Sequence, residues 1–388
     1  MFKSKKYLLI PLFLLLIALL CVLLNKKPDI ESKFVQNVSE TTSDFENESE
    51  KQTEIDNKEN NALDLSENTT DTEIKPTLPQ TFLENKFHVY QTFNNCGPAT
   101  LSMALKWYGI NAPQEELADK MRPYQHPEGD NDDKTIFTYE FVDWAKEYGV
   151  GAVGRVNGDI NLIKKFISNG FPVVVKTWLK KGEDIGHFRF VTGYDENKQL
   201  IYFDDSYDGP NRKMGYYDFL SLWQPFNYAY IVLYENSSED LIKEIIGQDW
   251  EEKIAYKNSL IRAEKENEKD PDNIYPIFNI STSAFHLGDY KKSVESFEKV
   301  QDRLTKRMLW YQIEPIKAYL ELKNYDKVFE IIGNILENGN RAFSELYMIR
   351  GDIYIEQGLK EKAKEQFELA LKYNTNMESA EEALNSLE

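Results

Sequence analysis

A repeat of 35 residues near the carboxyl end constrains the fold of this 388-residue chain more than any other feature. Three segments carry small or apolar residues at matching positions: Ser293, Phe297 and Val300, then Val328, Ile332 and Ile335, then Ala363, Phe367 and Ala370. Units this short cannot bury their own apolar faces, so the copies must stack against one another. The pattern predicts an all-α solenoid over 274–388, with three repeats that start near Ile274, Leu309 and Ser344 and a final capping helix.

These segments resemble tetratricopeptide repeats. The third copy is the clearest, because Gly351 and Tyr354 also stand at the positions of that family. The resemblance implies a concave face that binds peptides or proteins, so we expect a protein partner or substrate to dock there. It also implies that this groove is lined by residues of the first helices, namely Tyr275, Phe278, Trp310, Ile313 and Met348.

An apolar run of 18 uncharged residues, 7–24, has lysines on both sides. Its length suits a helix that crosses a bilayer. An uncleaved anchor is favoured over a signal peptide, because leucines surround Cys21 where a cleavage site would need small residues. We therefore expect a transmembrane helix within residues 1–27 and contact with the membrane through residues 7–24. The basic residues before the run and the acidic segment after it favour a single-pass cell-membrane protein with most of its chain extracytoplasmic.

An acidic segment follows the apolar run. Residues 28–80 hold fourteen Asp and Glu against four Lys and show no apolar periodicity, which predicts a disordered linker over 28–81. The whole chain has a formal net charge of −19. Nucleic-acid binding depends on basic surface that neutralises phosphates, so no nucleic-acid partner is expected.

Residues 82–236 combine helical and strand patterns. Helices are predicted from Cys96 to Gly109, over 138–147 and from Asp159 to Gly170, and strands over 171–178, 187–194, 199–204 and 229–234. Helices that come first and antiparallel strands that follow predict an α+β domain. The charged stretch 237–273 is expected to be a helical connector to the repeats.

Cys96 is the candidate for chemistry. It is the only cysteine beyond the apolar run, so it is either a buried small hydrophobe or a reactive thiol. Its place in the first turn of a predicted helix favours the thiolate. Gln91, five residues earlier, can bring its amide N–H beside the backbone N–H of Cys96 as a pair of oxyanion donors.

A thiolate nucleophile needs an imidazole partner, and the imidazole needs an orienting acceptor. His187 opens a predicted strand whose hairpin partner ends in Asp204 and Asp205. An odd number of loop residues would place Asp205 directly opposite His187, and an even number would place Asp204 or Ser206 there. The sequence leaves this choice open.

At these residues the sequence resembles the C39-like peptidases of the papain-like cysteine peptidase superfamily. The resemblance covers about 82–236 and rests on Gln91 with Asn95-Cys96-Gly97-Pro98-Ala99, Gly170-Phe-Pro-Val-Val-Val175, Gly186-His187-Phe188 and Tyr202-Phe-Asp-Asp205-Ser206. It implies a papain-like fold with Cys96 as nucleophile, His187 as general base and acid, Asp205 as its orienting acid and Gln91 as oxyanion donor. The chain departs from the family at Ser206, where a proline is usual.

The sequence thus predicts a membrane-anchored, extracytoplasmic cysteine peptidase that hydrolyses a peptide or protein substrate. Acyl transfer is an alternative, because an amine as well as water can attack an acyl-enzyme. An inactive peptidase-like binding module is another. No cofactor is expected, and no metal site is expected because the acidic loop 122–134 lacks the spacing of an EF-hand. If the repeats act only by docking, a chain without residues 272–388 should still turn over a short peptide.

Overall fold

The computed structural model describes residues 74–125 and 135–387, which all belong to one compact unit of the chain. The predicted membrane segment, most of the acidic linker and residues 126–134 of the acidic loop lie outside the described residues. Across the two described ranges, no helix has both the length and the apolar character needed to cross a bilayer.

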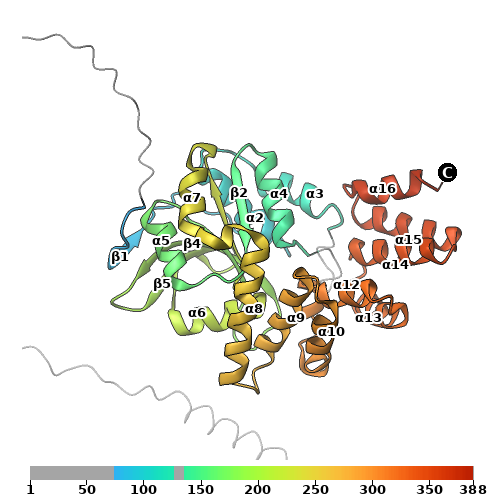
Figure 1. Cartoon of the computed structure of the whole chain (residues 1–388). Coiled ribbons are helices and arrows are strands. Elements are labelled where there is room, and N and C mark those ends of the chain that lie inside the picture. The colour runs from blue at the N-terminus through green and yellow to red at the C-terminus, as the bar shows by residue number, and fades with distance from the viewer. Residues whose placement is uncertain (1–73, 126–134, 388) are drawn as a thin grey trace, which may run out of the picture. The chain divides into compact units, whose positions relative to one another are not determined.

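A seven-stranded antiparallel sheet organises the first part of the chain (Figure 1). Its strands are β1 (Gln80–Phe82), β2 (Gly151–Arg155), β3 (Val173–Trp178), β4 (Gly186–Asp195), β5 (Leu200–Asp205), β6 (Gly209–Gly215) and β7 (Tyr230–Tyr234). They lie in the order β2-β7-β3-β4-β5-β6, and β1 pairs with the end of β4. The four predicted strands correspond to β3, β4, β5 and β7, whereas β1, β2 and β6 have no predicted counterpart.

Helices cover both faces of this sheet. They are α2 (Cys96–Trp107), α3 (Gln114–Met121) and α4 (Thr138–Glu147) on one face, and α5 (Ile160–Ser168), α6 (Tyr216–Trp223) and α7 (Glu239–Ile246) on the other. Neighbouring strand residues alternate between the two cores: Val174 packs with the first group of helices, and Val173 and Val175 pack with the second. The central strands are therefore apolar on both sides, which explains their continuous runs of Val, Ile and Phe.

The edges of this domain differ from the predicted boundaries. Strand β1 begins inside the predicted linker, and the Tyr194 hydroxyl donates to the carbonyl of Leu78 at 2.7 Å. Within the predicted connector, α7 packs Ile242 and Ile245 into the same apolar core as the sheet. The ordered domain therefore extends beyond 82–236 at both ends.

The rest of the described chain is helical and runs from the yellow α8 to the red α16 in Figure 1. After α8 (Glu252–Lys269) come α9 (Ile274–His286), α10 (Tyr290–Glu298), α11 (Met308–Tyr311), α12 (Glu314–Glu321), α13 (Tyr325–Glu337), α14 (Ser344–Glu356), α15 (Lys360–Tyr373) and α16 (Glu378–Asn385). Short 3₁₀ turns are η1 (Gln224–Phe226), η2 (Asn236–Ser238), η3 (Gly247–Trp250) and η4 (Gln301–Arg303).

The 35-residue period is visible in the three turns that link the two helices of each repeat. Gly288, Lys323 and Gly358 occupy them, and all three have left-handed backbone conformations, with φ of 81°, 56° and 71°. The predicted starts at Ile274 and Ser344 coincide with α9 and α14. The second repeat differs, because its first helix is broken into α11 and α12.

The helical region and the sheet domain share one apolar core. Phe137, Trp178 and Phe226 of the sheet domain belong to the same buried cluster as Phe278 and Trp310 of the helices. The Trp178 indole also donates to the Tyr275 hydroxyl at 3.2 Å. The repeats are thus built onto the sheet domain at the end of β3.

Candidate active site

Cys96 is the first residue of α2 and is partly buried. The preceding residue is held firmly, because the Asn95 side chain accepts from Arg122 and donates to Thr92 Oγ1 at 2.7 Å. These bonds fix the start of the helix. The thiol therefore lies beside the free N–H groups of the first turn, where the positive end of the helix dipole favours a thiolate.

His187 and Asp205 meet at neighbouring strand ends. The distance from His187 Nε2 to Asp205 Oδ1 is 2.8 Å, and the side chains are only 2% and 0% exposed. The backbone N–H groups of Tyr207 and Asp208 donate to the same oxygen at 2.9 and 3.0 Å. Arg189 Nε lies 3.1 Å from the other oxygen, Oδ2. The carboxylate is thus held from three directions and in turn fixes the imidazole ring.

A β-bulge decides which aspartate reaches His187. Four residues link β4 to β5, an even number that by itself would turn Asp204 toward the face of His187. Thr192 is an extra residue in β4, between the pairs Val191–Phe203 and Gly193–Tyr202. This insertion shifts the register by one residue and brings Asp205 to that face.

Neither of the two registers that the sequence left open is found. Asp205 lies directly opposite Arg189 and is the diagonal neighbour of His187 rather than its opposed partner. A diagonal pair on one face is still within reach of an imidazole and a carboxylate. Asp204 points elsewhere and accepts from Asn85 Nδ2 and from the N–H of Asn211, both at 2.7 Å.

The charges of the three groups support one another. Burial alone would raise the pKa of the Cys96 thiol, but the hydrogen bond and charge of His187 outweigh it and lower the pKa. Burial opposes the imidazolium too, yet the hydrogen bonds to Asp205 and Cys96 raise the pKa of His187. Burial is likewise overcome at Asp205, whose pKa is lowered by His187 and Arg189. These directions favour a thiolate–imidazolium pair held by a carboxylate.

Gln91 lines the same cavity as Cys96 and His187. Its side-chain oxygen accepts from Ser206 Oγ at 2.9 Å, and its backbone N–H donates to the Ser206 carbonyl at 2.8 Å. With that oxygen engaged, the amide has its two Nε2 protons left to donate. The structure thus brings Gln91, Cys96 and His187 to one cavity, with Asp205 bonded to His187 behind it. It also gives a role to the serine that replaces the usual proline.

This cavity, named the catalytic cavity after the candidate catalytic residues that line it, has a volume of about 460 Å³. Besides Gln91, Cys96 and His187, its walls include Arg122, Lys176, Lys180, Trp310 and Tyr311. Among its described lining residues Glu183 is the only acid, so the cavity is more basic than the protein as a whole. Trp310 and Tyr311 come from the helical region.

Lys176 is a functional candidate that the sequence analysis missed. It lies in the apolar strand β3, is 5% exposed, and donates to the carbonyl of Ile136 at 2.8 Å. The rings of Phe188 and Tyr311 both have their centroids 5.2 Å from its ammonium. Its charge adds to the forces that lower the pKa of Cys96. A lysine inside a run of buried valines was the available signal.

The predicted groove of the repeats does not exist as expected. Phe278, Trp310 and Ile313 are 0%, 3% and 4% exposed, and all three belong to the core shared with the sheet domain. Tyr275 bonds to Trp178, and Met348 packs partly buried against the same core. These side chains are occupied because the first helices pack on the sheet domain.

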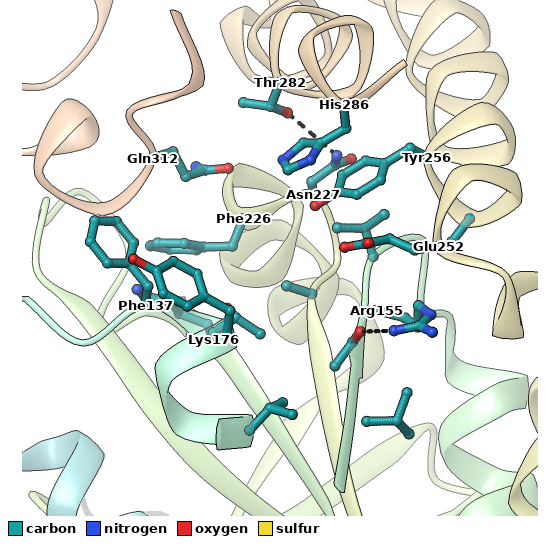
Figure 2. Close-up of a pocket in the computed structure, with 18 of the residues that line it drawn as sticks. Phe137, Arg155, Lys176, Phe226, Asn227, Glu252, Tyr256, Thr282, His286 and Gln312 are labelled. Atoms are coloured by element: carbon teal, nitrogen blue, oxygen red, sulfur yellow. Dashed lines mark hydrogen bonds between the residues drawn. The ribbon is translucent and has the colours of Figure 1, made fainter. Parts of the chain in front are cut away.

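A second cavity of about 680 Å³ lies between the sheet domain and the helical region (Figure 2). Figure 2 shows Arg155 and Lys176 on the strand side of this cavity and Thr282 and His286 of α9 on its other side. His286 stacks on Tyr256 with ring centroids 3.8 Å apart and lies 3.3 Å from Glu314. The cavity holds no thiol, so it does not repeat the chemistry of the first.

Metal binding has no support in the described ranges. No cluster of three or more His, Cys, Asp or Glu side chains suited to a metal ion occurs within 74–125 and 135–387. The acidic residues 128–133 lie in the part of the loop that the structure does not describe.

Comparison with known proteins gives two family matches. Residues 78–231 match the Peptidase_C39 like family, and residues 344–377 match the tetratricopeptide repeat. No curated protein matches the sequence. Both resemblances noted in the sequence are thereby confirmed.

Several solved structures are similar to parts of the chain. A C39-like peptidase from Bacillus anthracis is 19% identical, with 40% of this chain and 98% of that chain covered and a TM-score of 0.33. The peptidase domain of Streptococcus ComA, a bi-functional ABC transporter involved in quorum sensing, is 22% identical, with coverages of 38% and 97% and a TM-score of 0.31. A thermophilic tetratricopeptide-repeat protein of Thermus thermophilus is 20% identical, with coverages of 34% and 73% and a TM-score of 0.29. Residues 78–231 are thus similar to the C39-like peptidase family and have its fold, and they are followed by a helical region with a tetratricopeptide repeat.

Proposed function

We propose that this protein is a cysteine peptidase that hydrolyses peptide bonds in a peptide or protein substrate. The observation that carries the proposal is the buried pair of His187 and Asp205, 2.8 Å apart, with His187 lining the same cavity as Cys96. Because Nε2 of His187 is bonded to Asp205, its other ring nitrogen is left for the thiol. A thiol, an imidazole and an orienting acid in this order are the groups that acyl transfer to sulfur requires.

The reaction follows from these positions. The Cys96 thiolate attacks the substrate carbonyl, and the backbone N–H of Cys96 and the amide of Gln91 donate to the oxyanion that forms. His187 gives its proton to the leaving amine, and an acyl-enzyme remains. Water then attacks the thioester while His187 takes a proton from it, and release of the acid product restores the thiolate–imidazolium pair.

The test is peptide turnover by the chain without residues 1–73, since the described residues form one compact unit. A diverse peptide pool is incubated with the protein, and products are identified by mass spectrometry. Cleavage should disappear in Cys96→Ala and His187→Asn. His286→Asn, a histidine of the second cavity, is the matched control and should keep its activity.

Other outcomes would decide against hydrolysis. Products joined to an added amine acceptor would favour acyl transfer over hydrolysis. Cleavage that persists in Cys96→Ala would refute the nucleophile. Peptides that bind without turning over, in wild type and variants alike, would mean an inactive peptidase-like module.

We further propose that residues 7–24 anchor the protein in the cell membrane, with the peptidase domain outside the cytoplasm. The support is the uncharged length of the run, its flanking lysines and the acidic segment after it. Protease added to intact cells should remove an epitope tag placed at the carboxyl end of the chain. A tag that is digested only after lysis would contradict this orientation.

A further inference from the structure

The segment 307–312 of the helical region is bound to the sheet domain at both ends. Arg307 Nη1 lies 2.5 Å from Asp184 Oδ1, and the Arg307 backbone N–H donates to Oδ2 of the same residue at 3.3 Å. Gln312 Nε2 donates to the carbonyl of Pro225 at 2.8 Å. Asp184 lies three residues before His187, so this segment contacts the loop that leads into β4, the strand that carries His187.

Tyr311, the last residue of α11 before the break, packs directly on Gly186 at the start of β4. A Cβ atom added to Gly186 would lie 2.8 Å from Tyr311 Cε1, so only glycine leaves room for the ring. Trp178 and Phe226 meet the ring edge-on, with centroids 5.7 and 5.9 Å away. Contacts on several sides hold this ring in one position.

Tyr311 is also the partition between two cavities. It lines the catalytic cavity together with Cys96 and His187, and it lines the second cavity as well. Lys176 is shared in the same way, and Figure 2 shows it on the wall of the second cavity. A wall made of one aromatic ring and one lysine therefore limits the catalytic space on the side of the helical region.

We infer that Tyr311 is a specificity-determining residue, which sets the largest substrate side chain that the catalytic cavity accepts. The inference rests on the proposed function, because it assigns substrate binding to this cavity. A fixed ring excludes a bulky side chain by overlap, whereas a shorter residue at 311 would open the cavity toward the 680 Å³ space behind it. The repeats thereby act on substrate choice by contact with the bound peptide.

The first experiment measures selectivity in the full chain, in detergent solution. Peptides that differ only in the size of one side chain near the cleaved bond are compared for kcat/KM. Tyr311→Ala should shift the ratio of large to small side chains by about tenfold toward the large, while Tyr311→Phe keeps the wild-type ratio. Tyr311→Leu keeps an apolar side chain in the core and should give a shift in the same direction. Tyr325→Ala, which removes a partly buried tyrosine of α13 that lines neither cavity, is the matched control.

A second experiment works without turnover. Alkylation of Cys96 is followed on its proteolytic peptide by mass spectrometry, with iodoacetamide as the small reagent and pyrenylmaleimide as the bulky one. Tyr311→Ala should raise the bulky-to-small rate ratio about tenfold, and Tyr325→Ala should leave it unchanged. The same ratio in wild type, Tyr311→Ala and Tyr311→Leu would overturn the inference.

The two experiments separate the inference from the function on which it rests. A changed alkylation ratio in a protein that turns over no peptide would support the role of Tyr311 as a wall of the cavity and contradict the proposed peptidase function. Normal peptide turnover with unchanged selectivity and an unchanged alkylation ratio would support the peptidase function and contradict the role of Tyr311 in selectivity.

Discussion

Asp205 shows how single residues set the chemistry of this site. Its burial would favour the neutral acid, but His187, Arg189 and two backbone N–H groups lower its pKa and keep it charged. A charged Asp205 in turn raises the pKa of His187, and the imidazolium lowers the pKa of Cys96. The three residues therefore act as one unit, and each loses its property when a neighbour is removed.

The pH dependence of Cys96 alkylation tests this coupling. The thiol pKa is lowered from its ordinary 9.0, so the rate with iodoacetamide should rise as pH increases through a midpoint below 9.0. The His187 pKa is raised from 6.5. The rate of peptide turnover, measured as kcat/KM, should therefore fall at a pH above 6.5, where the imidazolium loses the proton that the leaving amine needs. In His187→Ala the alkylation midpoint should move upward. An unchanged midpoint would show that the imidazole does not stabilise the thiolate.

Ser206 is expected to position Gln91, because its hydroxyl engages the amide oxygen and leaves the Nε2 donors for the oxyanion. Ser206→Ala frees the amide to turn, so kcat should fall about tenfold with little change in KM. Ser206→Thr keeps a hydroxyl and should restore most of the rate. In a Gln91→Ala background the serine substitution should have no further effect. Equal losses in both backgrounds would mean a general structural role for Ser206.

At this scale the sequence predicts the identity of the site residues better than their arrangement. Cys96 and His187 stand in short motifs on the expected elements, so they can be identified without a structure. The choice between Asp204 and Asp205 depends on the extra residue Thr192, and a bulge in the middle of an apolar strand has no clear sequence signal. The sequence did not single out Tyr311 for another reason, because its contacts with Gly186 and Trp178 join segments more than a hundred residues apart.

Among the elements, the turns between the paired helices of the repeats recur every 35 residues with the same left-handed backbone, and one of them does not use glycine. Two turns use glycine, which adopts the left-handed conformation without strain, and the middle turn uses Lys323 with φ of 56°. Lys323 pairs only loosely with Glu356, at 3.7 Å on an exposed surface. The lysine therefore keeps a strained backbone without a compensating interaction of comparable size.

Lys323→Gly should therefore stabilise the protein. Relief of the left-handed strain outweighs the greater freedom of glycine in the unfolded chain, so the free energy of unfolding should rise by about 0.5–1 kcal/mol. The check is the midpoint of thermal unfolding by circular dichroism. Gly358→Ala, at the matching turn one repeat later, should lower that midpoint. A lower midpoint in Lys323→Gly would contradict the assignment of strain.

The strands divide into predictable and unpredictable ones for a physical reason. Strands β3, β4, β5 and β7 lie inside the sheet and carry long apolar runs. Strand β6 is an edge strand with the sequence Gly-Pro-Asn-Arg-Lys-Met-Gly, and β2 at the other edge is short and contains two glycines. Edge strands bury less side-chain surface, so their sequences give no comparable pattern.

For the whole molecule, the shared core changes what the repeats are expected to do. The sequence predicted a docking surface at a distance from the chemistry. The structure instead places Phe278 and Trp310 in a core with Trp178, and it brings Tyr311 to the catalytic cavity. The cause is tertiary packing: the sequence shows which helix faces are apolar but not whether another repeat or the sheet domain covers them.

Deletion of residues 272–388 should therefore impair the catalytic domain itself. It would expose Trp178 and Phe226 and remove Trp310 and Tyr311 from the cavity wall, at a cost of roughly 1.5–3 kcal/mol for each large side chain left uncovered. We expect a lower unfolding midpoint and a loss of kcat/KM of at least about tenfold on short and long peptides alike. Full activity of the truncated chain on a short peptide would restore the docking interpretation.

The break between α11 and α12 has a consequence for how such a protein can evolve. An ordinary repeat can be exchanged between proteins, since it needs only another repeat beside it. Here Tyr311 needs a glycine at position 186 and the aromatic rings of Trp178 and Phe226, which contact its own ring edge-on. If recombination joined these helices to a different peptidase, Tyr311 would clash with any side chain at the glycine position and would lack matching aromatic contacts. The two halves of the gene are therefore expected to be inherited together, and substitutions at 186 and 311 should occur in pairs.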